Sequence, residues 1–197
     1  MGDDIRAMAR PNLTTSKASR AARVTVSRPE LLEAGDDARF RDLLHAIFAF
    51  SSQLQAARAR FGAFIGLSPT QYMVLIAVAQ LAPQEAGVAQ IAERLYFSPA
   101  FVTIEVNKLV KLGLVIKSPN PKDGRRVVLR TSAEGDRRLA ALAEYQRPVN
   151  DALFASLKRR DFVLLHRVMT TLSANGDQAL ALAEFVETRL KSRAKAG

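Results

Sequence analysis

The sequence predicts a mainly α-helical protein that carries one small β-hairpin. From residue 36 onward, apolar residues recur at three- and four-residue spacing over most of the chain, which is the helical period. Ser68-Pro69 and Ser98-Pro99 are typical helix starts, with a capping serine followed by a proline in the first turn. The period then changes, because residues 114–118 and 127–131 are short β-branched runs that flank a polar stretch. We therefore expect four helices, a hairpin and two further helices.

Composition limits the class of protein. The chain has 197 residues, of which 48% are apolar, so it can bury a core in one domain or two small lobes. It has no cysteine, which excludes disulfides and thiolate chemistry. The net charge of +10 and the pI near 10.5 indicate an anionic partner. Charge alone does not distinguish nucleic acid, an acidic protein and an anionic membrane surface as that partner. The longest nearly apolar stretch, residues 72–82, is too short for a membrane span, and the N-terminus lacks a secretory signal. A cytoplasmic protein is expected.

The first third of the chain is expected to hold an arm and two helices. Residues 1–34 lack a periodic apolar pattern and are predicted to form a flexible basic arm. The next helix is expected from residue 36 to about residue 60, with an apolar stripe of Phe40, Leu43, Leu44, Ile47, Phe48 and Leu54. The helix after it should cover residues 69–81, because Ser68 and Gln71 can form a capping box and Pro83 follows its end.

The remaining elements follow from their start and stop signals. A short helix is expected over residues 88–95, after a turn that contains Gly87, and another from Ser98-Pro99 to about residue 112, where Gly113 ends it. Thr131 and Glu134 have the spacing of a capping box for a helix to about residue 157. Two signals modify the C-terminal helices: Pro148 predicts a kink or break, and Asn175-Gly176 an interruption of the last helix, expected over about 161–190. A basic tail, 193–197, closes the chain.

Two short helices joined by a three-residue turn and followed by a hairpin predict a winged helix-turn-helix. In this arrangement the second helix lies in the DNA major groove. Its apolar side should be Val102, Val106 and Leu109, packed on Ile91 and Leu95. Ala100, Ile104, Asn107, Lys108 and Lys111 should face away from the core, with Thr103 on the flank and Ser98 at the start. These residue types suit base edges and phosphates, although an ordinary solvated face has the same composition.

The hairpin is basic, since Lys117, Lys122, Arg125, Arg126 and Arg130 lie on it. An arginine at a projecting tip can enter the minor groove, where negative potential is concentrated. Of the two adjacent arginines, we expect Arg125 in the groove and Arg126 at a backbone phosphate. Asp123 would be repelled by phosphate, so we expect it to hold an arginine in place by a charge-assisted hydrogen bond. A plain solvated Asp-Gly turn is the alternative.

Together these segments resemble the MarR family of bacterial winged-helix regulators. The similarity runs from about residue 36 to the C-terminus and is carried by LSPTQYMVLIAVA, VAQIAERLYFSPAFVTIEVNKLVKLGLVIK and NPKDGRRVVLRTSAEG. It implies a winged helix-turn-helix DNA-binding domain at 63–131 and a helical dimerisation region at 36–62 and 132–192. It also implies a homodimer on palindromic double-stranded DNA and repression relieved by a small molecule. Phe101, Ile104 and Glu105 depart from a usual recognition helix, and the N-terminal arm is longer than usual.

The resemblance further implies an effector site between the DNA-binding lobe and the dimerisation helices. The corresponding positions are His45, Phe48, Ser52, Tyr72, Met73 and Ile76, which suit an aromatic or acyl compound. An apolar stripe of this kind is more often plain core.

Three other functions compete with that of a specific DNA-binding regulator. An enzyme is disfavoured, because the chain has no glycine-rich phosphate loop, no H-E-x-x-H motif and no histidine pair at metal-ligand spacing, so no cofactor, metal or catalytic residue is expected. A nonspecific architectural or RNA-binding protein fits the net charge and predicts no preferred site. A dimer that uses this fold for protein contact would show little loss of DNA affinity with salt.

Overall fold

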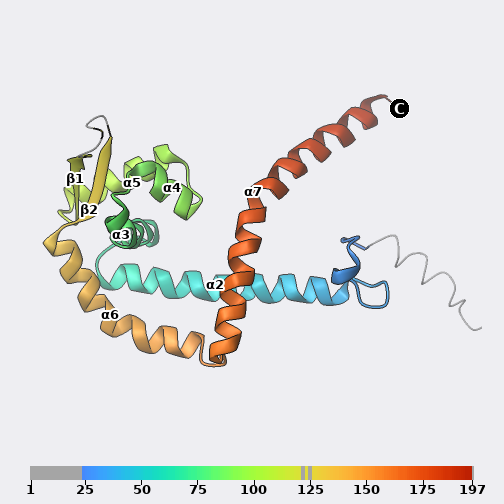
Figure 1. Cartoon of the computed structure of the whole chain (residues 1–197), viewed down its shortest axis with the longest axis horizontal. Helices are drawn as coiled ribbons and strands as arrows, with labels where there is room; N and C mark the ends of the chain where they lie inside the picture. Colours follow the sequence, from blue (N-terminus) through green and yellow to red (C-terminus); the bar gives the residue numbers. More distant parts are fainter. Residues whose placement is uncertain (1–23, 121–122, 124–125, 197) are drawn as a thin grey trace, which may run out of the picture. The chain divides into compact units, whose positions relative to one another are not determined.

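The computed structural model describes residues 24–120, residue 123 and residues 126–196. By its contacts the chain divides into two compact units, Met1–Ala143 and Glu144–Gly197. The first unit contains η1 (Pro29–Leu31), α2 (Ala38–Phe64), α3 (Pro69–Leu81), η2 (Ala82–Gln84), α4 (Val88–Leu95), α5 (Pro99–Lys111), β1 (Val115–Pro119) and β2 (Val127–Thr131), shown in Figure 1. Helix α6 (Ala133–Leu153) begins in this unit, and α7 (Arg159–Ala196) belongs to the second. The predicted mainly α fold with one hairpin is confirmed.

Both predicted serine–proline starts are confirmed. Ser68 accepts a hydrogen bond on Oγ from the Gln71 amide at 3.2 Å, and the Gln71 side chain accepts one from the Ser68 amide at 3.0 Å, which completes the capping box of α3. Ser98 accepts one from the Phe101 amide at 3.2 Å at the start of α5. These bonds satisfy amides that have no partner within the helix, so the two helices begin where the sequence predicts.

The core of the first unit lies where α3, α4, α5 and the hairpin meet. Helix α3 is mostly apolar and contacts α2, α4, α5 and β2, and six of its thirteen residues are buried. Fully buried side chains come from each of these elements, among them Leu75, Ile91, Val106, Leu109, Leu114 and Leu129. Leu129 of the hairpin and Leu114, the residue before it, therefore join the same core as the helices.

The connection from α5 to β1 is a tight, hydrogen-bonded turn. Gly113 takes a φ of 70°, a conformation that costs a glycine little. Its amide bonds to the Val110 carbonyl at 2.9 Å, and the Leu114 amide bonds to the Leu109 carbonyl at 2.9 Å. This is the Schellman arrangement, completed by the burial of both leucines. The predicted stop at Gly113 is confirmed.

Two predictions for the C-terminal helices are wrong, and a third is wrong in part. Ser132, rather than Thr131, caps α6: its hydroxyl accepts from the Gly135 amide at 3.0 Å, while the Thr131 hydroxyl donates to Asp136. Helix α6 continues through Pro148 to Leu153, so the predicted break is absent, while the alternative of a kink at Pro148 stays a prediction. Helix α7 continues through Asn175-Gly176, although its ribbon changes direction near the middle (Figure 1).

The segment before α2 has its own contacts, although most of the predicted arm lies outside the described residues. The Thr25 amide and hydroxyl both donate to Asp37 Oδ2 at 2.6 Å, and Arg41 forms an ion pair with the same carboxylate. These hydrogen bonds from Thr25, helped by Arg41, lower the pKa of the buried Asp37 carboxyl. Asp37 thus ties residues near 25 to the start of α2.

We expect this tie to be sensitive to acid. Because the pKa of Asp37 in the folded chain lies below its ordinary value of 3.8, the tie is at full strength above 3.8 and is lost as the pH falls through the lower folded value. The protection of the Thr25 amide from hydrogen exchange should decrease as the pH is lowered from about 7 to about 2. Asp37→Asn should remove that protection already at pH 7, whereas Asp42→Asn, within the first turns of α2, should keep it. Unchanged protection in acid would contradict this role of Asp37.

Within the part of the chain that the structure describes, no single helix is long and apolar enough to cross a membrane, and only α2 together with α3 and η2, bent by 84°, passes by length and composition.

Candidate nucleic-acid interface

Helix α5 has one buried and one exposed side, as predicted. Val102, Val106 and Leu109 are fully buried, and Ile91 of the neighbouring α4 is buried with them. The opposite side is exposed and consists of Ala100, Ile104, Asn107, Lys108 and Lys111. Since the buried side holds α5 on the core, the exposed side is available to a partner.

The hydroxyl groups at the start of α5 form hydrogen bonds within the helix, although they also lie at or near its surface. Ser98 is exposed but its hydroxyl accepts the N-terminal cap bond, and the half-buried Thr103 donates its hydroxyl to the Pro99 carbonyl at 2.8 Å. The turn before them contains Tyr96, which has a φ of 55° and a 64% exposed side chain. Such a conformation is uncommon for a large side chain, and here it lets α4 and α5 connect within three residues.

The three residues that depart from a usual recognition helix have different environments. Phe101 packs edge-on against Phe97, with ring centroids 5.2 Å apart, and stays 39% exposed. Ile104 points outward with 52% of its surface exposed. Glu105 is buried, and its carboxylate pairs with Lys108 Nζ at 2.7 Å. Glu105 is therefore no obstacle to an anionic partner, because it faces the core and its charge is partly balanced.

The hairpin β1–β2 and its loop, residues 115–131, form the wing. The strands pair antiparallel from Val115 with Thr131 to Pro119 with Val127, which leaves a loop of residues 120–126. Lys122 and Arg125, two of the predicted DNA-binding residues, lie outside the described residues. The described part of the loop is closed by hydrogen bonds from the Asn120 amide to the Arg126 carbonyl at 2.8 Å and from the Arg126 amide to the Asp123 carbonyl at 2.9 Å.

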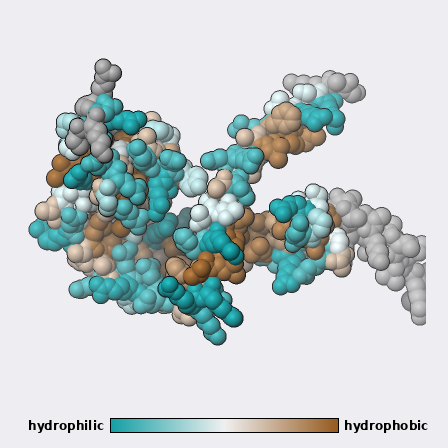
Figure 2. Space-filling model, in the orientation of Figure 1, coloured by the Kyte–Doolittle hydropathy of each residue, from teal (hydrophilic) through white to brown (hydrophobic). Residues whose placement is uncertain are grey.

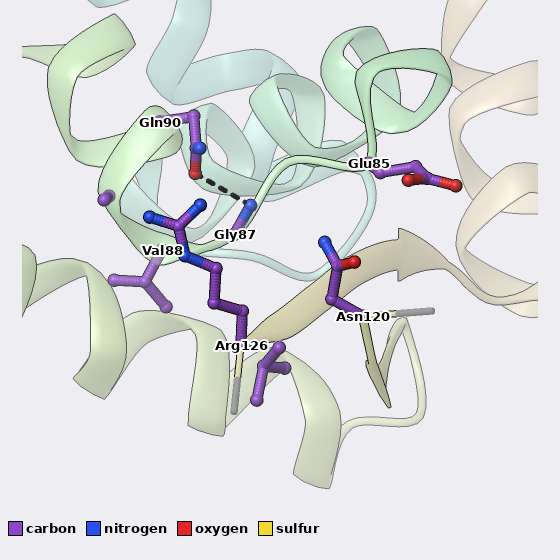
Figure 3. A pocket seen from close by; sticks show the side chains of 8 residues that line it. Glu85, Gly87, Val88, Gln90, Asn120 and Arg126 are labelled. Atoms are coloured by element: carbon purple, nitrogen blue, oxygen red, sulfur yellow. Dashed lines mark hydrogen bonds between the residues drawn. The ribbon is translucent and has the colours of Figure 1, made fainter. Parts of the chain in front are cut away.

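Asp123 lies within ion-pair distance of an arginine. Its Oδ2 lies 3.8 Å from Arg126 Nε, and both side chains are more than half exposed. In Figure 3 the Arg126 side chain extends from the wing toward the start of α4. Among the described residues, Arg126 is the arginine within ion-pair distance of Asp123. From the sequence alone, we expect Arg126 to contact a backbone phosphate. An exposed pair at this distance contributes little to stability, so the guanidinium can exchange it for another anion.

The base of the wing is fixed to the turn between η2 and α4, which the sequence did not identify as part of the site. The Leu129 amide donates to the Ala86 carbonyl at 3.0 Å, and Arg130 forms an ion pair with Glu85 at 3.9 Å. A Cβ on Gly87 would lie 2.7 Å from the Val127 carbonyl oxygen, so only glycine allows this approach. A pocket of about 240 Å³ remains between the turn and the wing, lined in part by Gln90, Asn120 and Arg126 (Figure 3). These contacts hold the wing at a set angle to α4.

Comparison with known proteins agrees with this geometry. Residues 65–126, from the end of α2 to the wing, match the family model described as MarR family.

This segment of the chain is similar to the MarR family.

Solved structures share the fold over most of the chain. A probable transcriptional regulator from Pseudomonas aeruginosa is 28% identical, with a TM-score of 0.51 over 68% of this chain and 98% of that chain. A mutant MarR from E. coli, crystallised with operator DNA, is 15% identical, with a TM-score of 0.56 over 68% and 95%. An organohalide-sensing regulator in its 2,4-dichlorophenol-bound form is 22% identical, with a TM-score of 0.54 over 77% and 86%. No curated protein sequence matches the chain.

The residues expected at a MarR effector site fall into two groups. On α2, His45, Phe48 and Ser52 are exposed, and the side chain of Phe48 is 68% exposed. On α3, Tyr72 is buried, with its ring centroid 6.2 Å from that of Phe61, and Met73 and Ile76 are half-buried. Positions 48 and 61 of α2 are about 20 Å apart at a rise of about 1.5 Å per residue. Within one chain the α2 group is therefore well separated from Tyr72, which packs as a core residue.

The described residues contain no group of three or more histidines or acidic residues that could hold a metal ion. The relatives reported above are transcription regulators rather than enzymes.

Proposed function

We propose that this chain is a homodimeric, sequence-specific DNA-binding repressor of the MarR family. The observation that carries this proposal is the exposed side of α5, where Asn107, Lys108 and Lys111 lie beside a basic wing while the other side of the helix is fixed in the core. Amide and ammonium groups on one helix face can contact base edges and phosphates together. The E. coli relative solved with operator DNA has the same fold, which supports a duplex as the partner.

The apolar surfaces of α2 and α7 support the homodimer. Leu43, Ile47 and Phe48 on α2 are exposed. Helix α7 exposes a longer series at three- and four-residue spacing: Phe162, Leu165, Met169 and Leu172. Figure 2 shows hydrophobic side chains at the surface of both helices. Helices with exposed apolar stripes of this length need a partner in water, and a second copy of the chain is the partner proposed here.

A dimer places two copies of α5 on one duplex. We expect them to contact two half-sites of an inverted repeat, about one helical turn apart, because the symmetry of the site follows that of the protein. Each half-site would then be read by Asn107 and its neighbours on α5, with Ala100 and Ile104 available to thymine methyl groups.

The proposed release signal is a small aromatic or acyl compound. The organohalide-sensing relative was solved with 2,4-dichlorophenol bound, which supports an aromatic ligand. Since the α2 group of candidate residues is exposed and distant from Tyr72 in one chain, the site we propose requires the second copy to complete it. Phenols and aromatic carboxylates should therefore be screened for release of bound DNA by the intact dimer, and a compound that acts only on the dimeric protein would support this site.

Arg125 is proposed to enter the minor groove. Arg125→Ala should lower affinity for the operator by about 1–3 kcal/mol and leave the dimer intact, because one arginine–groove contact is lost. The affinity can be measured by fluorescence anisotropy with a labelled operator. Arg147→Ala, which removes an exposed arginine of α6 outside the winged helix, is the control and should bind as the parent protein does. Equal affinity of Arg125→Ala and the parent protein would exclude Arg125 from the interface.

A further inference from the structure

Lys117 of the wing forms a hydrogen bond with Asn107, the polar residue of α5 proposed to contact base edges. Its Nζ donates to Asn107 Oδ1 at 2.5 Å, although the two residues belong to different elements. Both side chains are exposed, and Asn107 lies on the side of α5 that faces away from the core. The contact therefore lies on the surface that would meet a base pair.

The chemistry of the contact determines how the Asn107 amide is turned. A lysine ammonium has three N–H donors and no acceptor, so only the oxygen of an amide can face it. With Oδ1 turned toward Lys117, the NH₂ group of Asn107 points away from the wing strand. Lys117 keeps its two remaining N–H groups. The pair thus presents the remaining N–H groups of Asn107 and Lys117 to a partner. The Asn107 Oδ1 atom already accepts a hydrogen bond from Lys117.

We infer that Lys117 is a specificity-determining residue, which makes the Asn107–Lys117 pair select guanine. An asparagine that is free to turn prefers adenine, since it donates to N7 and accepts from the N6 amino group. Guanine instead presents two acceptors, N7 and O6, in the major groove. The N–H groups of Asn107 and Lys117 can donate to N7 and O6 of guanine. With adenine, one of these N–H groups would face the N6 amino group, which is itself a donor. This inference rests on the proposed function, because it requires α5 in the major groove.

The test is a selection of bound duplexes from a random library by the full-length dimer and its variants. Asn107→Ala should lose its preference at one position of each half-site, which identifies the base that Asn107 contacts. At that position the parent protein should prefer guanine over adenine by about tenfold or more. Lys117→Met removes the donors and should move the preference to adenine, whereas Lys117→Arg keeps donors and should retain guanine.

Lys111→Met is the matched control, because it removes one exposed lysine from the same helix without touching Asn107. It should lower affinity for all sequences alike and leave the preferred base unchanged. A preference for adenine in the parent protein, no affected position in Asn107→Ala, or unchanged base preference in Lys117→Met would each overturn the role of Lys117. If the parent protein enriches no sequence at all, the proposed function fails together with this inference.

Discussion

The double substitution Leu165→Glu and Leu172→Glu is expected to convert the protein from dimer to monomer and to reduce operator affinity more than about a hundredfold. Both leucines are exposed in the single chain, at 39% and 51%, so a charge there should not disturb the fold of one chain. In a dimer the same positions would be covered, and burying unpaired carboxylates is strongly unfavourable. Losing the second α5 removes the avidity of two linked half-sites, which is about 10²–10⁴. Sedimentation velocity and operator titration measure the two effects.

The control is Thr171→Glu combined with Ala174→Glu. It adds the same charge to the same helix, at exposed positions on the side opposite the apolar stripe. This variant should remain dimeric and lose only the small affinity that two added negative charges remove. A monomeric parent protein, or a stripe variant that binds the operator as tightly as the parent, would contradict the proposed dimer surface.

Leu109→Ala is expected to lower the free energy of unfolding by about 2–5 kcal/mol. The side chain has no exposed surface and comes from the last turn of α5, whose Leu109 carbonyl accepts from the amide of the buried Leu114 just before the wing. Its removal leaves a cavity that the α5–β1 turn cannot fill, because backbone hydrogen bonds hold that turn in place. Urea unfolding followed by circular dichroism measures the change.

Leu112→Ala is a close control for this substitution. It removes the same atoms three residues away, but the side chain is 48% exposed and the residue is the C-terminal cap of α5. We expect it to cost less than about 1 kcal/mol. Equal losses for Leu109→Ala and Leu112→Ala would mean that the packing of α5 against the core contributes less than the structure indicates.

Local signals in the sequence predicted most of the fold, because they act over a few residues. Ser68 and Ser98 were identifiable as caps since a hydroxyl followed by proline satisfies amides within one turn. The burial of Val102 and Val106 followed from the helical period. The end of α5 was predictable because Gly113 can take a positive φ at low cost.

The errors arose where local signals compete or where distant contacts decide. Thr131 and Ser132 can both cap a helix, and only the position of the Gly113 carbonyl, which accepts from the Ser132 hydroxyl at 2.5 Å, distinguishes them. Pro148 and Gly176 weaken a helix locally, but a helix of 21 or 38 residues can tolerate one unfavourable residue when the others support it.

Parts of the candidate interface could not be predicted because they depend on contacts between elements. The bond between Ala86 and Leu129 joins segments more than 40 residues apart, and no spacing in the sequence signals it. The contact of Lys117 with Asn107 depends on the angle of the wing to α5 in the same way. The sequence identified Asn107 and Lys117 as polar and basic residues, but it did not predict that they contact each other.

Selection of bound fragments from genomic DNA, at physiological salt and with competitor DNA present, tests the central claim most directly. A dimeric, sequence-specific repressor should enrich one inverted repeat with half-sites about one helical turn apart. The enriched site should bind at least about a thousandfold more tightly than unrelated DNA. Retention of fragments without any common sequence would contradict the account and would favour a nonspecific architectural protein.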